Sequence, residues 1–397
     1  MLKNRDFIVF GLQSWSIDIG STCKYTAQEI AKNNRVLYVS VPINRKSLLT
    51  NKNSTIVQDY NLILNGSQPA LTRVGENIWN LNPKTIIESI NWIGNPSVFD
   101  FFNKINDKRI YKEIQKAINE LGFKDVILLN DNSMIIGQYF KEFFKPKAYI
   151  YLLRDAVTMV SYHAKHGKRL EPELIKKVDF VVTNSEFFRN YASEFNQKSY
   201  LIGQGCNLEL YNDKSGNLPI PDEMKVYRKP IIGYVGFLTT IRLDIELLVE
   251  IAIHNKEWSL VLVGPEDEDF KKSKLHDLEN VYFLGKRPIN DLPAYIKSFD
   301  VAINPQIVNP ITDINYPLKI DEYLAMGKPT VATKTSFMSY FGNYVYLCRD
   351  AEEWILNILK ALEENTPEKE KERIAYASTH SWGHFVEKIY TQLEKIL

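Results

Sequence analysis

Short apolar runs alternate with longer amphipathic segments along this chain, and this alternation is the feature that most constrains its fold. The runs are apolar at every position rather than at every second one, which is typical of strands buried on both faces of a parallel sheet. In the first half of the chain, the clearest runs are 7–12, 36–41, 126–129, 148–153 and 180–183. Helical segments such as 22–33 lie between them. The pattern predicts a doubly wound α/β architecture.

The alternation stops once and then restarts, which predicts two domains. Residues 212–228 contain glycine, prolines and charges with little periodicity, and we interpret them as a linker between domains over 1–211 and 229–374. The second domain has its own apolar runs, at 231–235, 260–263, 281–285, 301–304 and 330–333. In residues 375–397, apolar side chains recur at spacings of three and four. We expect this segment to form a C-terminal helix that packs back on the first domain.

Charge and cysteine usage exclude some partners. The chain has 397 residues, with 49 Lys and Arg against 48 Asp and Glu, a net charge of +1, so nothing favours a nucleic acid. The three cysteines are scattered, without metal-type spacing, which fits a reducing compartment. No run of about 20 apolar residues and no signal peptide is present. We expect a cytoplasmic protein.

One predicted helix in the first domain allows a second interpretation of where the protein is located in the cell. Basic residues alternate there with apolar ones, at Lys104, Lys108, Arg109, Lys112 and Lys116. A solvated helix face is the favoured interpretation. The alternative is a basic amphipathic helix that rests on anionic lipid, which would make the protein peripheral on the inner face of the membrane.

The most informative run covers residues 315–333, where a loop feeds a short helix that ends at Gly327 before a buried strand. A helix N-terminus offers free N–H groups and partial positive charge, so it suits a diphosphate. Lys319 in the first turn adds a full charge. Glu322 lies on the same face and could accept hydrogen bonds from ribose hydroxyls. Taken alone, these two residues could equally be an ordinary surface pair.

This run resembles the donor-site signature of the group 1 glycosyltransferases (family 4), and it is most similar to their teichuronic-acid-type members. Segments 231–236, 262–265, 280–285 and 292–301 follow in the family's order, and weaker similarity covers 178–185 and 200–207. The resemblance implies an α/β GT-B fold, with two facing Rossmann-like domains, an inter-domain cleft and a C-terminal helix. The first domain would then lie on the acceptor side and the second would bind a nucleotide-sugar donor.

The resemblance also implies roles for single residues. Glu322 matches the glutamate that holds the donor ribose, and Arg242 takes the position of a phosphate-binding lysine after the Gly236 turn. We therefore expect Arg242 and Lys319 to be catalytic, as charges that stabilise the leaving diphosphate. The donor-binding set is expected to comprise Gly236, Asn315, Pro317, Leu318 and Glu322.

Two departures from the family pattern concern the donor site. Phe237 stands where an arginine is common, and Ile314 stands where the pattern has a second acid. Lys319 is expected to supply the charge missing at 237. Asp313 and Asn315 are substitutes for the missing acid by adjacency only.

The first domain offers further candidates where its strands end, which is where ligands bind in open α/β sheets. Gly20 could let the backbone approach a phosphate or an acceptor, but a plain turn is an equal alternative. Arg154 and Asp155 follow a buried strand, as cleft residues or as a structural ion pair. His163 is expected to contact the donor sugar near its anomeric carbon, as a histidine does in similar enzymes. The alternative for His163 is a solvated helix end.

Metal and cofactor sites are not expected. Residues 267–269 contain a DxD pattern, but within an acidic run that favours a solvated loop, and no His/Cys cluster has metal spacing. We expect no cofactor, since the nucleoside-diphosphate sugar is a co-substrate. A GxGxxG fingerprint is also missing, which makes an NAD-dependent dehydrogenase a distant alternative.

The preferred hypothesis is a glycosyltransferase (EC 2.4), retaining and metal-independent, that acts in surface polysaccharide or glycoconjugate synthesis. Its donor would be a UDP- or GDP-sugar, and its acceptor a hydroxyl of a glycan or of a lipid-linked molecule. Two alternatives stay open. One is a nucleotide-sugar epimerase or phosphorylase on the same fold, and the other is a non-catalytic nucleotide-sugar or glycan-binding protein.

Overall fold

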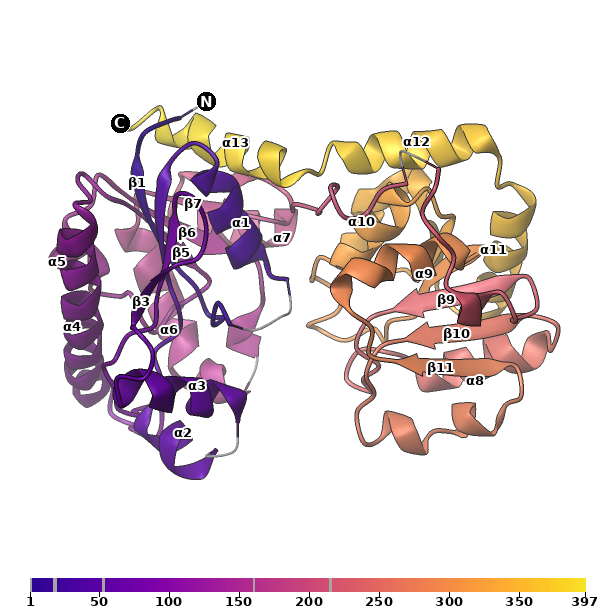
Figure 1. Ribbon diagram of the computed structural model, residues 1–397, viewed down its shortest axis with the longest axis horizontal. Coiled ribbons are helices and arrows are strands. Elements are labelled where there is room, and N and C mark those ends of the chain that lie inside the picture. The colour runs from indigo at the N-terminus through magenta and orange to yellow at the C-terminus, as the bar shows by residue number, and fades with distance from the viewer. Residues whose placement is uncertain (1, 17–19, 52–53, 160, 214–215) are drawn as a thin grey trace. The chain divides into compact units, whose positions relative to one another are not determined.

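The computed structural model describes residues 2–16, 20–51, 54–159, 161–213 and 216–397. The chain forms two compact units. Unit 1 comprises Met1–Gly203 and Trp382–Leu397, and unit 2 comprises Gln204–Ser381. Each unit is a sheet with helices packed on it (Figure 1), as the alternation of apolar runs and amphipathic segments predicts.

The described strands of unit 1 form one sheet in the order β3-β4-β2-β1-β5-β6-β7-β8. Their bounds are Asp6–Phe10 (β1), Arg35–Val39 (β2), Leu71–Arg73 (β3), Ile78–Leu81 (β4), Ile127–Asp131 (β5), Ala148–Leu153 (β6), Phe180–Thr183 (β7) and Ser199–Leu201 (β8). Adjacent strands are parallel except β3, which runs antiparallel to β4. The uniformly apolar runs are buried along their whole length because helices cover both faces.

The helices of unit 1 start and stop where local chemistry favours it. They are Thr22–Ala31 (α1), Arg45–Thr50 (α2), Thr55–Leu64 (α3), Pro96–Leu121 (α4), Phe140–Phe144 (α5), Ser161–Lys177 (α6) and Glu186–Ser193 (α7). For example, the Asn95 side chain caps α4, Pro96 begins it, and Gly122 ends it in a left-handed conformation. The asparagine-rich segment 51–99, which shows no clear pattern in the sequence, contains α3 and the β3–β4 pair.

Unit 2 contains a second parallel sheet, in the order β11-β10-β9-β12-β13-β14. Its strands are Ile231–Val235 (β9), Ser259–Val263 (β10), Val281–Gly285 (β11), Val301–Asn304 (β12), Thr330–Thr333 (β13) and Tyr346–Cys348 (β14). Its helices are Ile245–His254 (α8), Leu292–Ser298 (α9), Leu318–Ala325 (α10), Ala351–Glu363 (α11) and Pro367–Ser378 (α12). Two apolar clusters, one on each face of the sheet, form its core.

The C-terminal segment is interrupted once. Residues 375–378 complete α12, and a new helix, α13, spans Trp382–Leu393. The helix breaks between them because the carbonyl of His380 accepts a hydrogen bond from the Cys206 amide at 2.6 Å, outside any helical pattern. The expected apolar face of α13 is confirmed, since Trp382, Phe385, Ile389 and Leu393 are buried in the core of unit 1, beside α1.

In both sheets the strand order reverses next to the first strand of the unit. The reversal lies between β1 and β5 in unit 1, and between β9 and β12 in unit 2. Doubly wound proteins bind their ligands at the carboxyl ends of the strands beside such a switch point. The search for a site therefore begins at residues 10–12 and 131–136 of unit 1 and at residues 235–243 and 304–319 of unit 2. Among the described helices, none is both long and apolar enough to cross a membrane.

Candidate active site

Two glycines shape the switch point of unit 2. Gly236 follows β9 with φ of 149°, Gly264 follows β10 with φ of 151°, and side chains are strained at both angles. The two turns also touch, because a Cβ atom on Gly264 would lie 1.8 Å from the carbonyl oxygen of Gly236. Because residue 236 is glycine, no side chain of its own covers the backbone at the end of β9.

Helix α10 lies against this turn. The Tyr323 hydroxyl accepts a hydrogen bond from the amide of Val235, the last residue of β9, at 2.8 Å. A buried carboxylate holds the first turn as well, because Asp321 accepts from the Tyr316 hydroxyl at 2.6 Å and contacts His380 Nδ1 at 2.8 Å. No side chain caps the N-terminus of α10 at Pro317. Its first N–H groups are therefore available to an anion.

Lys319 lies next to the glycine turn. Its ammonium donates to the Tyr234 hydroxyl at 2.6 Å and sits 4.3 Å from the centre of that ring. A Cβ atom on Gly236 would come within 3.1 Å of the same Nζ. Within the described residues, the ammonium forms no ion pair with Glu322, so the two are not a simple surface pair. The lysine side chain therefore ends beside the turn.

Glu322 is one turn further along α10 and is half-buried. Burial raises the pKa of this carboxyl to about 7, while the charge of Lys319 and a hydrogen bond from Tyr211 oppose the rise. Near neutral pH the group is thus divided between its two protonation states. In either state it can accept a hydrogen bond from a ligand hydroxyl.

The loop that carries Arg242 is held at both ends. Asp267 accepts hydrogen bonds from the Thr240 amide at 2.8 Å and the Phe270 amide at 2.7 Å. Beyond it, the Ile307 amide donates to the carbonyl of Arg242 at 2.9 Å. The Arg242 guanidinium is exposed and has no carboxylate partner among the described residues. The DxD pattern at 267–269 thus begins with a loop anchor, and Glu268 pairs with Lys271.

The two departures from the family pattern differ in exposure. Phe237 is 55% exposed directly after Gly236, whereas Ile314 is buried in the loop before α10. The carboxylate of Asp313 is occupied by Ser336, whose amide and hydroxyl both donate to it at 2.7 Å. The side-chain oxygen of Asn315 is buried and has no partner in the described chain. Asn315 is therefore better placed than Asp313 to receive a ligand hydroxyl.

Nothing in the sequence pattern marks Asn304 as a site residue, although it ends β12 at the switch point. It is buried, and both polar atoms of its amide lack partners among the described residues. An orphaned amide at this position is costly unless a ligand or water satisfies it. Tyr234 in β9 and Tyr211 in the loop after β8, the partners of Lys319 and Glu322, are likewise not marked in the sequence, since tyrosines in such places look like core.

In unit 1, the charged pair after β6 is part of an ion-pair network. The Arg154 guanidinium contacts both carboxylate oxygens of the buried Asp131, at 2.7 and 3.0 Å, and it also pairs with Asp155. Its charge is therefore balanced inside the protein. Gly20 lies against Tyr25, whose hydroxyl would be 2.3 Å from a Cβ atom at position 20.

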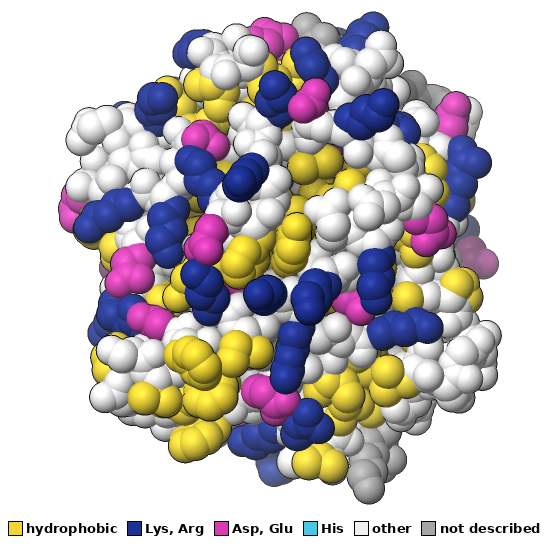
Figure 2. Space-filling model, turned by 90° about the vertical axis from the view of Figure 1, so that its left-hand side faces the viewer, with side chains coloured by type: hydrophobic (Ala, Val, Ile, Leu, Met, Phe, Trp, Pro, Cys, Tyr) yellow, Lys and Arg dark blue, Asp and Glu magenta, His cyan; other side chains and the backbone are white. Residues whose placement is uncertain are grey.

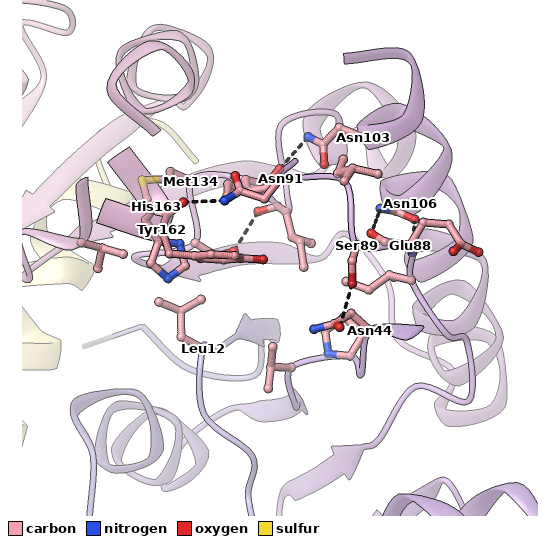
Figure 3. A pocket seen from close by; sticks show the side chains of 18 of the residues that line it. Leu12, Asn44, Glu88, Ser89, Asn91, Asn103, Asn106, Met134, Tyr162 and His163 are labelled. Carbon is pink, nitrogen blue, oxygen red and sulfur yellow. Dashed lines mark hydrogen bonds between the residues drawn. The ribbon is translucent and has the colours of Figure 1, made fainter. Parts of the chain in front are cut away.

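His163 lines a cavity of about 190 Å³ in unit 1 (Figure 3). The cavity lies at the carboxyl ends of the strands, with Leu12 after β1 and Asn132 after β5 among its lining residues. Burial lowers the pKa of His163, so its imidazole is neutral at neutral pH. His166, by contrast, is a core residue that stacks on Phe99 and bonds to the carbonyl of Ile93 at 2.9 Å.

The donor-side candidates and the unit 1 candidates thus fall at two separate switch points. Gly236, Pro317, Leu318, Lys319 and Glu322 gather around one turn and one helix end of unit 2. Arg242 lies on the loop that follows the same turn. In unit 1 only His163 lines the cavity, while Arg154 and Asp155 form an ion-pair network and Gly20 packs on a tyrosine. The roles of all these residues remain predictions.

Comparison with known proteins agrees with this geometry. Residues 229–364 match the family model of group 1 glycosyl transferases. A Bacillus subtilis protein named as a teichuronic acid biosynthesis glycosyltransferase, TuaH, is 28% identical over 249 residues. That match covers 59% of this chain and 62% of the relative, so the chain spans less than two thirds of that protein's length.

Solved structures share the fold across the whole chain. Sucrose-phosphate synthase from Thermosynechococcus elongatus has a TM-score of 0.66 at 15% identity and covers 99% of both chains. Anabaena HepE in complex with UDP has a TM-score of 0.66 at 14% identity, over 98% of this chain and all of the other. An Escherichia coli trehalose-6-phosphate protein bound with UDP-2-fluoro glucose reaches 0.67 at 12% identity, over 99% of both chains.

The family match and these structures agree on the architecture. Two parallel α/β sheets followed by C-terminal helices are the arrangement of GT-B proteins, as the sequence predicted. Residues 229–364 thus resemble the group 1 glycosyl transferases, the whole chain has the fold of GT-B proteins, and there is distant similarity to TuaH.

Proposed function

We propose that this protein transfers a sugar from a nucleoside-diphosphate sugar to a hydroxyl acceptor, with the donor bound by unit 2. One observation carries the proposal: an uncapped helix N-terminus and the Lys319 ammonium meet the open Gly236 turn at the switch point. That combination fits a diphosphate, because N–H groups, helix dipole and a full charge point to one place. The family match over residues 229–364 supports the same function.

In the proposed reaction, the bond between the anomeric carbon and the diphosphate breaks, and a bond to the acceptor oxygen forms on the same face of the sugar. The acceptor proton passes to the leaving phosphate oxygen. Lys319, Arg242 and the α10 N-terminus stabilise the charge that develops on the diphosphate. Glu322 accepts hydrogen bonds from the donor ribose. Retention of configuration rests on family resemblance, and the proposed charges act without a metal.

The donor is proposed to be a UDP- or GDP-sugar. Relatives of the same fold include HepE in complex with UDP-glucose and a trehalose-6-phosphate protein bound with UDP-2-fluoro glucose. We place uridine first among the nucleotides to test. The acceptor is a glycan or a lipid-linked molecule, within surface polysaccharide or glycoconjugate synthesis.

Thermal shift with UDP, GDP, ADP and their sugars tests the donor site directly. We expect one nucleotide to raise the melting temperature, since a ligand that binds only the folded state stabilises it. Glu322→Ala and Arg242→Ala should each remove most of this shift. Lys256→Ala, a change on the exposed surface of unit 2, is the control and should keep it. If no nucleotide gives a shift, the transferase proposal fails.

Product analysis separates transfer from the two alternatives. A transferase releases nucleoside diphosphate faster when an acceptor is present. An epimerase would change the sugar while it stays attached to the nucleotide, and a phosphorylase would require phosphate. Nucleotide binding with no turnover under any of these conditions would favour the non-catalytic binding protein.

A lipid-linked acceptor would bring the protein to a membrane, and we propose that unit 1 makes that contact through α4. Around this helix, Lys108 and Lys112 each fall about 20° from Phe101, on opposite sides of it, with Lys104 and Lys116 on the flanks. Lys108 and Lys112 have no acidic partner among the described residues. Figure 2 shows the face that bears α4, with basic side chains spread over it and apolar patches between them.

Exposed aromatic side chains accompany these lysines. Trp92, in the loop before α4, is 77% exposed, and Phe101 is 64% exposed. Aromatic rings beside basic residues suit the interface of an anionic bilayer. The test is sedimentation with phosphatidylglycerol vesicles. Trp92→Ala/Phe101→Ala should weaken binding about tenfold. Lys108→Glu/Lys112→Glu should weaken it at least about thirtyfold, at about 1 kcal/mol per basic residue removed.

Matched surface changes in unit 2 serve as controls for the vesicle experiment. Val226, which is 78% exposed, can be changed to Ala, and Lys256→Glu/Lys272→Glu alters charge to the same extent. Neither should affect sedimentation. Equal losses in the control variants, or no sedimentation of the unchanged protein at low salt, would overturn the membrane contact.

A further inference from the structure

The cavity in unit 1 has the size of a subsite rather than of a long groove. Its volume of about 190 Å³ corresponds to about six water molecules at liquid density. The residues that line it come from the segments after β1, β2, β4, β5 and β6, and from α4 and α6. It therefore lies where the carboxyl ends of the parallel strands meet, the usual ligand position of this architecture.

Two side chains of the cavity present unsatisfied hydrogen-bond acceptors. Asn103, which is 1% exposed, uses its amide NH₂ to donate to the Ile135 carbonyl at 2.8 Å. Asn91 uses its NH₂ to donate to the Tyr162 carbonyl at 2.6 Å. The side-chain oxygens of both residues are buried and have no partner in the described chain. Because each NH₂ is already bound, the amides are fixed with their oxygens unsatisfied (Figure 3).

Three other asparagine side chains of the cavity already have partners. Asn44 accepts from the Ser47 amide and the Ser89 hydroxyl, and Asn106 exchanges hydrogen bonds with the backbone of Glu88. Asn132 accepts from the Arg154 and Asp155 amides. These groups build the walls. A ligand that donates hydrogen bonds to the side-chain oxygens of Asn91 and Asn103 would therefore satisfy both.

The charges around the cavity favour a neutral ligand. Glu88, its acidic lining residue, pairs with Arg45 at 2.8 Å and Arg109 at 3.3 Å. The lining includes no lysine or arginine, and the His163 imidazole is neutral. A carboxylate or phosphate would thus meet two unpaired amide oxygens and no free cation, and its desolvation would be uncompensated.

The remaining lining is apolar, with Leu12, Val41, Ile90, Phe99 and Met134 among its members. Such walls suit the C–H face of a pyranose ring, while its hydroxyls reach the amide oxygens. We propose that this cavity binds an uncharged sugar unit of the acceptor, and that Asn91 and Asn103 recognise its hydroxyl groups. The inference rests on the proposed transferase function and names the acceptor class that unit 1 selects.

Saturation-transfer NMR on the full chain tests this proposal with small glycosides. The probes are methyl glucoside, methyl N-acetylglucosaminide and methyl glucuronide, so that ring size is matched and charge is varied. At least one neutral glycoside should bind, and the glucuronide should bind at least tenfold more weakly. Absence of signal from both neutral glycosides, or equal binding of the glucuronide, would overturn the proposal.

Variants assign the binding to the two amides. Asn91→Ala and Asn103→Ala should each weaken the neutral glycoside about tenfold, the loss expected when a buried hydrogen bond to a ligand is removed. Asn119→Ala is the control, because it is an exposed asparagine on the same helix. If Asn103→Ala does not fold, the less buried Asn91 still decides the outcome, together with Asn103→Ser.

The nucleotide experiment keeps the two proposals separate. Asn91→Ala and Asn103→Ala should leave the thermal shift with nucleotide unchanged, since they lie in unit 1. A normal nucleotide shift without glycoside binding would reject only the acceptor subsite. Loss of both in the unchanged protein would reject the proposed function itself.

Discussion

The two units share a strand order around their switch points but have different chemistry there. In unit 2, the end of β9 is bordered by two glycines, Lys319 and the uncapped end of α10. In unit 1, the end of β1 borders a cavity whose unsatisfied groups are amide oxygens. One topology thus supplies two candidate ligand positions, and the side chains around each favour an anion in unit 2 and a neutral molecule in unit 1.

The treatment of positive charge makes the difference clear. Arg154 in unit 1 lies after β6 and is neutralised by Asp131 and Asp155. Arg242 in unit 2 has no carboxylate partner among the described residues, and Lys319 donates only to a tyrosine hydroxyl. A buried ion pair contributes to structure, whereas an unmatched cation at a strand end is available to a ligand. Whether a cation is paired with a carboxylate therefore indicates its role better than the number of cations at a site does.

The largest effect is expected from removing the unmatched cations. Lys319→Ala and Arg242→Ala should each lower kcat/KM for transfer by about 10² to 10³, the range for one electrostatic contact to a developing negative charge. Steady-state kinetics with the donor identified by thermal shift measures this. Arg154→Met is the comparison in unit 1, and it should act mainly on stability. A similar kinetic loss for Arg154→Met in a stably folded protein would erase the distinction between the units.

The glycine contact of unit 2 should be nearly as sensitive. Gly264→Ala places a Cβ atom 1.8 Å from the Gly236 carbonyl at a φ of 151°, and we expect a loss of about 3 kcal/mol in unfolding free energy. Gly285→Ala has a φ of 65° but nothing within 4 Å, so it should lose only about 1 kcal/mol. Urea denaturation compares the two. Equal losses would mean that the backbone contact is unimportant.

Glu322 should give unit 2 a pH dependence of stability. Its pKa of about 7 in the folded protein exceeds the ordinary value of 4.5, so the folded state retains a proton that the unfolded chain loses in this window. Its contribution to stability is therefore largest at low pH and declines as pH rises from about 4.5 to about 7. Glu322→Gln should remove that decline. The change that the variant causes in the ligand-free unfolding free energy should therefore be more favourable at pH 8 than at pH 5, by about 1.4 kcal/mol for each unit by which folding raises the pKa of Glu322.

Thermal denaturation at pH 5 and pH 8, without nucleotide, measures the effect of Glu322→Gln. Asp107 in unit 1 has a similar pKa of about 7 from burial, with opposing hydrogen bonds from the Gly137 and Tyr139 amides. Asp107 is present in both the unchanged protein and Glu322→Gln, so its contribution to the pH dependence cancels when the two are compared. A difference that does not change with pH would show that Glu322 titrates normally.

The smallest effect concerns the departure at Phe237. Phe237→Arg adds a cation at an exposed position next to Gly236, and it should tighten nucleotide binding about fivefold, or about 1 kcal/mol. Phe187→Arg, at an exposed position of unit 1, should leave it unchanged. Calorimetry with the preferred nucleotide distinguishes them. Unchanged affinity in Phe237→Arg would mean that Lys319 already supplies the charge that the family usually places there.

Much of the fold could be predicted from the sequence because buried parallel strands are short and uniformly apolar. The runs at 148–153 and 180–183 coincide with β6 and β7, and the expected helix at 22–33 contains α1. The segment 51–99 resisted prediction because its strands β3 and β4 have only three and four residues, and because asparagines are frequent in the loops around them. The helix break at 379–381 also escaped prediction, since it depends on a hydrogen bond to Cys206, far away in sequence.

The sequence by itself determined which residue types stand at the strand ends, because strand–helix alternation and the run at 315–333 are local patterns. It placed Lys319 and Glu322 in one helix turn and Arg242 after a glycine turn. Only the tertiary structure decided which of the polar groups are satisfied. Arg154, after β6, pairs with Asp131 at the end of the adjacent strand β5, and Lys319 donates to Tyr234. Among the described residues, the side-chain oxygens of Asn91, Asn103 and Asn304 have no partner. Partners of this kind come from distant segments of the chain, so no local pattern reveals them.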